Sequence, residues 1–409
     1  MEMINCFIPY LSLSQAEQTI KGLRLCDRIK KIYLLSAEPA SGTVMGCEVL
    51  SVGSLSSTAA CRTIASHADT AYTLLYTKHT TLEPGQFALE RMLAIAGDTH
   101  AGMLYADHYQ VEAGVYKPAP VIDYQQGSLR DDFDFGSVLL FDSAVLKQAV
   151  AAMDRDYHFA GLYDLRLRVS ELAELVHINE YLYSEVEQDK RKSGEKLFDY
   201  VDPKNRAVQI EMEAACTAYL KRCGGYLAPR FEPIAFDAGT FEQEASVIIP
   251  VRNRIRTIED AIRSVLAQQT TFRFNLIIID NHSTDGTSEV IDKYTSDERV
   301  IHLIPARSDL GIGGCWNLGV HHPACGKFAV QLDSDDVYSG SDTLQKIVNA
   351  FYEQNCAMVV GTYRMTDFAM NEIPPGVIDH KEWTPENGRN NALRINGLGA
   401  PRAFYTPVL

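Results

Sequence analysis

The chain has 409 residues, of which 46% are hydrophobic and 22% charged, a globular composition that excludes collagen, disordered chains and small disulfide scaffolds. At about 100–200 residues per domain, its length predicts two or three domains. Its 38 Lys and Arg against 53 Asp and Glu give a net charge of −15, which repels nucleic acids and anionic lipids. A phosphorylated ligand would therefore need local donors or a bridging cation.

The nine cysteines predict a reducing compartment, because no two have CxxC spacing and several lie in apolar stretches. The N-terminal sequence MEMINCFIPYL lacks the basic region and long apolar core of a signal peptide. No apolar run approaches the ~20 residues that span a bilayer. We therefore expect a cytoplasmic protein without a transmembrane segment, for which peripheral docking on a membrane stays open.

The N-terminal half, residues 1–187, contains short apolar segments of the kind that form buried strands. In chain order they are Cys6–Leu11, Lys31–Ser36, Ala71–Leu82, Gly102–Gly114 and Phe133–Leu146. A linker is expected over residues 188–244, where a polar stretch precedes a helix at about 203–223 that begins at Asp202-Pro203.

From residue 245 to residue 409, apolar strands alternate with helical segments. The expected strands are Ser246–Val251, Phe274–Asp280, Val300–Ile304, Lys327–Asp333 and residues 357–363, and the expected helices include 255–269, Gly313–His321 and 341–354. Continuously apolar strands separated by helices predict a mostly parallel sheet covered on both faces. This half is therefore expected to be a doubly wound α/β domain.

The apolar segments of the two halves follow one order, which predicts a duplicated domain. Pro9 and Pro250 are 241 residues apart, and Thr77 and Asp333 are 256 apart, so the register drifts modestly. The fold is accordingly expected to be two tandem doubly wound α/β domains, the first of them degenerate. Two unrelated α/β domains with a coincidental order are the alternative.

Acidic residues stand where two strands of the C-terminal half end. Asp280 ends the second strand, and Asp333 ends the fourth and begins the run Asp333-Ser334-Asp335-Asp336. Ligands of parallel sheets bind beyond the carboxyl ends of the strands, and crowded carboxylates repel unless a cation or solvent separates them. This pattern predicts a Mg²⁺ or Mn²⁺ site shared with a diphosphate. A solvated turn in which Asp caps the next helix is the alternative.

Four motifs in this order resemble the nucleotide-sugar-binding half of family-2 glycosyltransferases of the GT-A fold. They are SVIIPVRNR, IIIDNHSTDGT, DLGIGGCWNLGV and VQLDSDD, within residues 245–363. The resemblance implies a metal-dependent inverting transferase of polysaccharide biosynthesis that moves a sugar from a nucleotide diphosphate, most often UDP, to a glycan or lipid-linked glycan. The alternatives are a nucleotide-sugar-binding or scaffold protein without turnover, and a nucleotidyltransferase, which usually has glycines after its first strand.

The resemblance also implies roles for single residues. The loop after the first strand would border the nucleobase, Asp280 would hydrogen-bond the base, and Asp333 and Asp335 would hold the metal. The implied nucleotide-sugar-binding residues are Pro250, Val251, Asn253, Asp280, Asp285, Gly311, Asn317, Asp333 and Ser334.

The sequence departs from the family pattern in the glycine-rich motif. Trp316 stands where the family often has Arg, either as a stacking wall of the site or as a core residue. Three arginines, Arg252, Arg254 and Arg307, are candidate phosphate donors, for which a surface salt bridge is the ordinary alternative.

The general base of the reaction is left unassigned. In the family it is an acidic residue well downstream, whereas this sequence stops at Leu409, roughly forty residues short of its own internal copy. We therefore expect a shortened chain whose base would lie beyond Leu409. The alternatives are no catalysis at all or a local base, for which the candidates are Asp367, Asp379, His380 and Glu382.

The N-terminal half has Thr77-Lys78-His79 at the position of the acidic run, and therefore no carboxylate there for a metal. Lys78 could replace the cation as a point charge at a diphosphate. A degenerate copy that serves as a scaffold or an acceptor-binding surface is favoured.

Acidic residues elsewhere in the N-terminal half are expected to be structural. The group Asp131, Asp132 and Asp134 is predicted to be a solvated acidic turn. Asp164 is expected to form an ion pair with Arg166 or Arg168.

Overall fold

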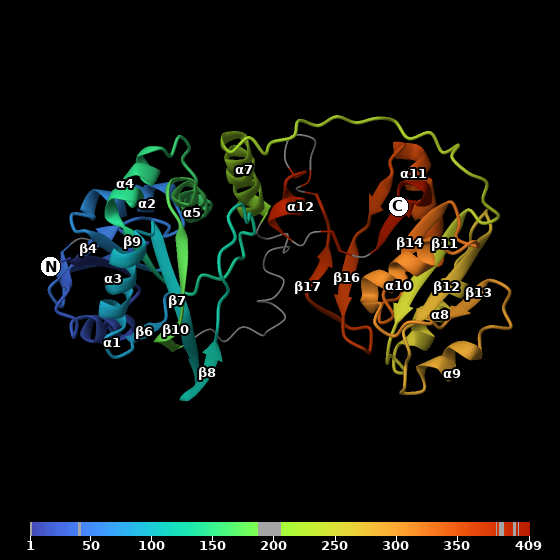
Figure 1. The fold of residues 1–409 in the computed structure, drawn as a ribbon, viewed down its shortest axis with the longest axis horizontal. Coiled ribbons are helices and arrows are strands. Elements are labelled where there is room, and N and C mark those ends of the chain that lie inside the picture. Colours follow the sequence, from blue (N-terminus) through green and yellow to red (C-terminus); the bar gives the residue numbers. More distant parts are fainter. Residues whose placement is uncertain are drawn as a thin grey trace. The chain divides into compact units, whose positions relative to one another are not determined.

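The computed structural model describes residues 2–39, 42–186, 206–381, 383, 388–395, 398–399 and 401–409 (Figure 1). The chain divides into two compact units. Unit 1 consists of Met1–Leu227 with Lys381–Ile395, and unit 2 of Ala228–His380 with Asn396–Leu409. This division differs from the expected boundaries, because part of the expected linker and a C-terminal segment pack with unit 1. The expected helix start at Asp202-Pro203 lies outside the described residues.

Unit 2 alternates strands and helices as the apolar pattern predicts. Its elements are β11 (Ala245–Val251), α8 (Ile258–Leu266), β12 (Phe274–Asp280), α9 (Thr287–Asp292), β13 (Val300–Leu303), α10 (Gly311–Val320), β14 (Phe328–Gln331), α11 (Thr343–Gln354), β15 (Met358–Val360), β16 (Tyr363–Thr366), β17 (Glu372–Ile378), β18 (Arg402–Tyr405) and a 3₁₀ turn at Thr406–Val408. The sheet order is β13-β12-β11-β14-β18-β15. The first four strands are parallel, and β18 runs antiparallel to both of its neighbours.

Both faces of the unit 2 sheet are covered, because side chains along a strand point alternately to opposite faces. On β11, Val247 and Ile249 pack into a core with residues of α8 and α11. Ile248, between them, faces the second core, to which α10 contributes Cys315. The expectation of a doubly wound sheet is confirmed for this unit.

Unit 1 has a larger mixed sheet. Its elements are β1 (Ile4–Pro9), α1 (Leu13–Leu23), β2 (Ile29–Ser36), β3 (Thr43–Val44), β4 (Cys47–Ser51), α2 (Thr58–His67), β5 (Tyr72–Tyr76), β6 (Thr81–Pro84), α3 (Ala88–Thr99), β7 (Met103–Glu112), β8 (Val115–Ala119), β9 (Val138–Asp142), α4 (Ser143–Ala151), α5 (Gly161–Leu172), β10 (Leu175–Val186), α7 (Arg206–Arg222) and α12 (Asn391–Arg394). The sheet order is β3-β4-β2-β1-β5-β9-β7-β10-β6, with β8 beside β7.

The central strands of the two sheets follow one topology. In unit 1 the order β4-β2-β1-β5-β9-β7 is parallel through its first four strands, and β9 is antiparallel to both neighbours. The order β13-β12-β11-β14-β18-β15 of unit 2 has the same directions, strand for strand. The apolar segments that follow one order in the sequence therefore occupy corresponding places in the two sheets.

A buried ion pair joins α12 to the rest of unit 1. The fully buried guanidinium of Arg394 pairs with the carboxylate of Asp131 and donates to Oε1 of Gln209 at 2.7 Å. The expectation of a solvated turn is therefore wrong for Asp131. The expected ion pair of Asp164 is confirmed with Arg168, at 2.8 Å.

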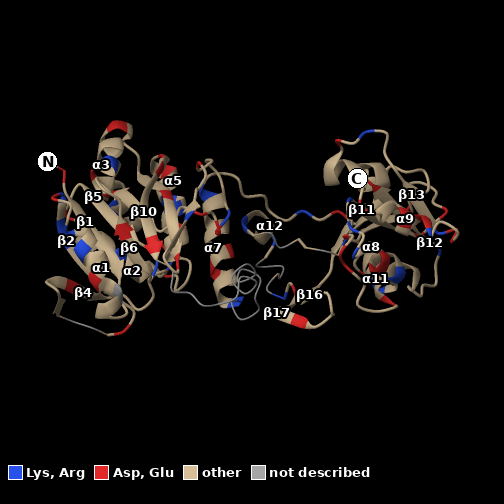
Figure 2. Cartoon of the chain, turned by 90° about the horizontal axis from the view of Figure 1, so that it is seen from below, with Lys and Arg blue, Asp and Glu red and all other residues tan. Residues whose placement is uncertain are grey.

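Charged residues are interspersed over the elements of both units, as Figure 2 shows. All nine cysteines fall within the described residues and are unpaired, and most of them are buried. Within the described part of the chain, no helix is both long and apolar enough to cross a bilayer.

Candidate nucleotide-sugar site

The candidate site lies where three neighbouring parallel strands of unit 2 end. β12 and β14 both pair with β11, and Val251 at the end of β11 is level with Asp280 at the end of β12. Asp333 follows β14 by two residues. Because neighbouring strands lie about 4.8 Å apart, the strand ends that carry Asp280 and Asp333 are about 10 Å apart, one on each side of β11. An elongated ligand above β11 can therefore reach both strand ends.

Asp280 is fully buried, and both of its carboxylate oxygens accept hydrogen bonds. Oδ1 accepts from the backbone N–H of Ser283 at 2.9 Å, and Oδ2 accepts from the hydroxyl of Ser288. Burial opposes the charged form, but these hydrogen bonds outweigh it and lower the pKa of Asp280 below its ordinary value. Asp280 is therefore an ionised acceptor held in place by the residues after β12.

His302 on β13 lies beside Asp280, a neighbour that the sequence alone did not indicate. Its Nε2 lies 3.6 Å from Oδ2 of Asp280, and its Nδ1 is 2.8 Å from Oδ1 of Asp292. The imidazole thus lies between a buried and an exposed carboxylate. The available signal was a histidine inside the apolar segment VIHLI.

Hydrogen bonds join the loop after β11 to the loop after β12. Asn253 has a left-handed backbone (φ +53°), which Asn tolerates better than most residues. Its N–H donates to Oγ of Ser283 at 2.9 Å, and its Oδ1 accepts from the N–H of Thr284 at 2.8 Å. Oδ2 of Asp285 accepts from the N–H of Ile255 at 3.1 Å. Asn253 and Asp285, both predicted to contact the ligand, therefore also shape the loops.

The acidic run after β14 forms a turn with crowded negative charge. Asp333 accepts a hydrogen bond from Nε2 of Gln331 at 3.0 Å, and Ser334 is buried. The pKa of Asp336 is raised to about 6, mainly because atoms packed around its carboxyl group hinder solvation and also because Asp333 and Asp335 are negatively charged. Part of the residue nevertheless faces solvent. A cation would relieve this crowding.

One arginine of the loop after β11 reaches the acidic run. Nε of Arg254 lies 3.7 Å from Oδ2 of Asp335, and both side chains are half exposed. Arg307 instead pairs with Asp309 on the surface, as the ordinary alternative predicted. Arg252 is exposed and has no ion pair or hydrogen bond within the described residues. Of the three candidate phosphate donors, Arg254 alone is placed against the acidic run.

The helix α10 brings the glycine-rich motif against the sheet. Gly311 begins the helix with φ +59°, and Asn317 is exposed on it. A Cβ on Gly319 would lie 2.6 Å from a side-chain carbon of Ile248, so the close approach of helix and sheet requires glycine there. Trp316 is partly buried and packs against the core between α10 and the sheet, which favours its reading as a core residue.

A local general base is not evident among the candidates. Oδ1 of Asp367 accepts from the N–H groups of Ala369 and Asn371, each at 2.9 Å. Hydrogen bonds from the Asn371 side chain and these backbone groups lower the pKa of Asp367, which makes its carboxylate a weaker proton acceptor. Asp379 and His380 each interact with neighbouring groups, and Glu382 lies outside the described residues.

A divalent cation fits the acidic run only with further ligands from elsewhere. Among the described residues, no three His, Cys, Asp or Glu side chains gather closely enough to hold a metal alone. Mg²⁺ and Mn²⁺ are commonly bound through one or two carboxylates, with phosphates and water completing the shell. The hard oxygen atoms of Asp333 and Asp335 suit such a partial site.

The sequence model described as "Glycosyl transferase family 2" matches residues 246–403 of the chain. This stretch contains Asp280, the acidic run and the loop with Arg254. Residues 246–403 belong to glycosyl transferase family 2. The resemblance carried by the four motifs is thereby confirmed.

Curated relatives match the family 2 domain over part of their own length. The putative teichuronic acid biosynthesis glycosyltransferase TuaG of Bacillus subtilis is 32% identical over 120 residues, which are 29% of this chain and 46% of TuaG. An uncharacterized glycosyltransferase of Haemophilus influenzae is 30% identical over 128 residues, 31% of this chain and 50% of that protein. The chain spans about half, or less, of the length of these relatives.

Two solved structures also show similarity to parts of the chain. Residues 1–349 of Staphylococcus aureus TarS, in complex with UDP-GlcNAc, show 11% identity and a TM-score of 0.37, over 54% of this chain and 72% of that one. The mannosyltransferase PcManGT of Pyrobaculum calidifontis, in complex with GDP-Man and Mn²⁺, shows 21% identity and a TM-score of 0.27, over 31% of this chain and 37% of that one.

Proposed function

We propose that the family 2 domain is an inverting glycosyltransferase. It moves a sugar from a uridine diphosphate sugar to a hydroxyl group of a glycan or lipid-linked glycan, in the cytoplasm and with Mn²⁺ or Mg²⁺. The observation that carries this proposal is the placement of Asp280 and the acidic run on opposite sides of β11, with Arg254 against Asp335. A donor lying across β11 would then have its nucleoside near Asp280 and its charged diphosphate near the acidic run.

The nucleoside end of the donor is proposed to lie over β11 and β12. Asp280 is ionised and held by two hydrogen bonds, and because its side chain is fully buried, a local shift would have to expose a carboxylate oxygen before it accepts from an N–H of a base. The diphosphate end lies toward Asp333 and Asp335. The proposed contacts are those that the family resemblance implies, namely Pro250, Val251, Asn253, Asp280, Asp285, Gly311, Asn317, Asp333 and Ser334.

In the proposed reaction, the acceptor oxygen forms a bond to the anomeric carbon as the bond from that carbon to the diphosphate oxygen breaks. The bonding pair leaves with the nucleoside diphosphate, and the acceptor proton passes to a base outside the residues assigned here. Asp333 and Asp335 would hold the divalent ion, which would supply Lewis-acid stabilisation to the leaving diphosphate. Arg254 is proposed to donate to the diphosphate as well, because among the described residues only an exposed contact with Asp335 engages its Nε.

Unit 1 is proposed to be a degenerate copy of the fold of unit 2. The shared order and direction of six strands support a duplication. Thr77-Lys78-His79 follows β5, the counterpart of β14, and offers no carboxylate for a metal. The donor site of the chain is therefore assigned to unit 2.

A thermal-shift experiment tests the donor site. UDP with Mn²⁺ should raise the melting temperature, since a ligand at a hundred times its Kd stabilises by about 2.7 kcal/mol. Asp335→Ala should abolish the Mn²⁺-dependent part of the shift. Asp309→Ala, which removes an exposed carboxylate that pairs with Arg307, is the matched control. An unchanged Mn²⁺-dependent shift in Asp335→Ala would refute the metal assignment.

A binding protein without turnover is the second candidate, because Asp367, one of the local candidates for the base that the structure describes, is used in a turn. Release of UDP from UDP-glucose and UDP-GlcNAc, with and without glycan acceptors, separates the two. Metal-dependent UDP binding without any UDP release would favour the binding protein. Release that disappears in Asp335→Ala would support the transferase.

A further inference from the structure

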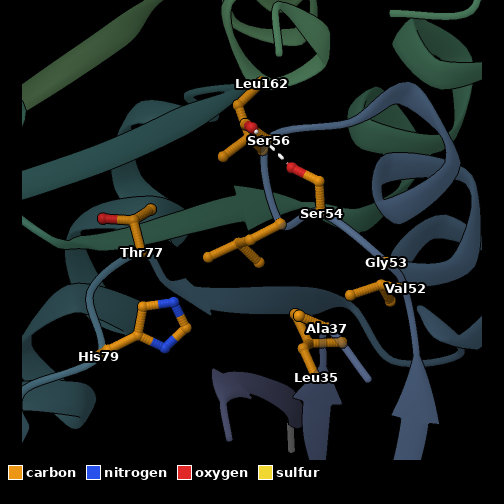
Figure 3. A pocket seen from close by; sticks show the side chains of 10 residues that line it. Leu35, Ala37, Val52, Gly53, Ser54, Ser56, Thr77, His79 and Leu162 are labelled. Atoms are coloured by element: carbon orange, nitrogen blue, oxygen red, sulfur yellow. Dashed lines mark hydrogen bonds between the residues drawn. The ribbon is translucent and has the colours of Figure 1, made fainter. Parts of the chain in front are cut away.

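A cavity in unit 1 lies at the carboxyl ends of its parallel strands. Its volume is about 430 Å³, within the range of about 300–1,000 Å³ that small-molecule pockets occupy. Leu35 comes from the end of β2, Val52 follows β4, and Thr77 follows β5 (Figure 3). This is the edge where ligands of open parallel sheets bind. The position and size therefore suit a ligand site separate from the proposed donor site.

The lining of the cavity carries no charged side chain, since none of its residues is Asp, Glu, Lys or Arg. Atoms packed around part of the His79 ring lower the pKa of this one titratable group although the residue as a whole is exposed, which favours the neutral imidazole. A phosphate or a carboxylate would enter this cavity without a counter-charge. The lining therefore favours a ligand without net charge.

Lys78, the nearest candidate cation in the sequence, is engaged elsewhere. Its Nζ lies 2.5 Å from Oε2 of Glu185 on β10, a carboxylate that is almost fully buried. Using Lys78 for a diphosphate would leave Glu185 buried without this partner, which is costly. The sequence-based alternative of Lys78 as a substitute for a metal is therefore disfavoured.

The polar groups of the cavity are neutral hydrogen-bonding groups on two sides of it. Figure 3 shows the hydroxyls of Ser54 and Ser56 on one side, 3.0 Å apart, and the ring of His79 on the other. Within the described residues, no hydrogen bond or ion pair engages the His79 ring. Leu55 and Leu162, which are only partly buried, add an apolar surface, which suits the C–H face of a pyranose.

We infer that the cavity of unit 1 binds a neutral carbohydrate. Hydroxyl groups of the sugar bond to Ser54, Ser56 and His79, while its apolar face rests on Leu55 and Leu162. A nucleoside fits less well, because no aromatic ring other than His79 lines the cavity for a base to stack on. The inference is independent of the transfer proposed for unit 2.

Ligand-observed NMR and calorimetry on the full chain test this site, with maltose, cellobiose and N,N′-diacetylchitobiose as probes at millimolar concentrations. Ser56→Phe fills the cavity and should weaken binding at least tenfold. His79→Ala removes one hydrogen-bonding group from an exposed residue and should weaken binding about three- to tenfold while leaving the fold intact. Ser66→Phe, on the exposed face of α2, is the matched control and should bind like the wild type.

The competing outcomes are distinct. No binding of any of the three sugars, or binding that neither Ser56→Phe nor His79→Ala weakens, would overturn the inference. Displacement of the sugar by uridine, or by UDP with Mn²⁺, would overturn it as well, because the cavity would then be a nucleotide site. Should Ser56→Phe fail to fold, His79→Ala decides alone. Failure of UDP to bind unit 2 leaves this test unaffected.

Discussion

The guanidinium of Arg254 lies 3.7 Å from the carboxylate of Asp335, across the loops that follow β11 and β14. Both side chains are half exposed, so the pair contributes little to stability, about 0–1 kcal/mol. A weak contact of this kind can be exchanged at small cost for a cation on Asp335 and a phosphate on Arg254. Arg254 and Asp335 would therefore separate when the proposed donor binds, Asp335 to contact the cation and Arg254 to contact the diphosphate.

Replacing Arg254 tests this exchange. Arg254→Ala should weaken UDP binding in the presence of Mn²⁺ by about 1–2 kcal/mol, five- to thirtyfold, through the loss of a charged hydrogen bond. Its melting temperature without ligand should stay close to that of the wild type. Calorimetric titration with UDP measures the effect, and Arg307→Ala provides a surface arginine for comparison. Equal UDP affinity in both variants would remove Arg254 from the site.

The charge of Asp280 should make unit 2 sensitive to acid. Because its pKa in the folded state is lowered, its contribution is complete above the unfolded pKa of about 3.9 and is lost as the pH falls through the folded value. Asp280→Asn should cost about 1.5–3 kcal/mol at pH 7, and this difference should shrink below about pH 4. Denaturation at several pH values measures it. The exposed Asp260→Asn should show no such trend, and a constant difference for Asp280→Asn would contradict the assignment.

Gly319 sets how closely α10 approaches the sheet. A Cβ there would lie 2.6 Å from Ile248 and 2.9 Å from Ile279, so Gly319→Ala should destabilise unit 2 by about 1–3 kcal/mol. In the same helix, a Cβ on Gly313 meets nothing within 4 Å. Gly313→Ala should therefore be neutral or stabilising by up to about 1 kcal/mol. Thermal melting of the two variants checks the contrast, which equal effects would refute.

The buried pair of Arg394 and Asp131 should be costly to break. Arg394→Met leaves the Asp131 carboxylate buried without its partner and should cost about 3–5 kcal/mol. Lys21→Met, which breaks an exposed pair with Glu17 on α1, should cost less than about 1 kcal/mol. Adding Asp131→Asn to Arg394→Met should recover part of the loss. A loss for Arg394→Met no larger than for Lys21→Met would show that the pair is solvated.

Much of unit 2 was predictable because its strands are continuously apolar, whereas apolar residues in its helices recur at helical spacing. The segment Phe274–Asp280 was predicted with its observed ends, since an acidic residue stops the apolar run where β12 stops. Asp280 was likewise placed at a strand end, whereas Asp333, predicted to end the fourth strand, follows β14 by two residues. The family of residues 246–403 was recognised from four local motifs.

The partners of charged side chains were decided by the tertiary structure. Asp131 and Asp132 are neighbours in one acidic run, yet Asp131 meets the buried Arg394 from 263 residues away while Asp132 pairs with Arg130 at the surface. His302 was overlooked because one histidine in an apolar strand gives no sign of the carboxylate on the next strand. Local sequence determined where strands end and which residues are charged. Burial and pairing depend on which distant segments pack together, and local sequence does not encode that.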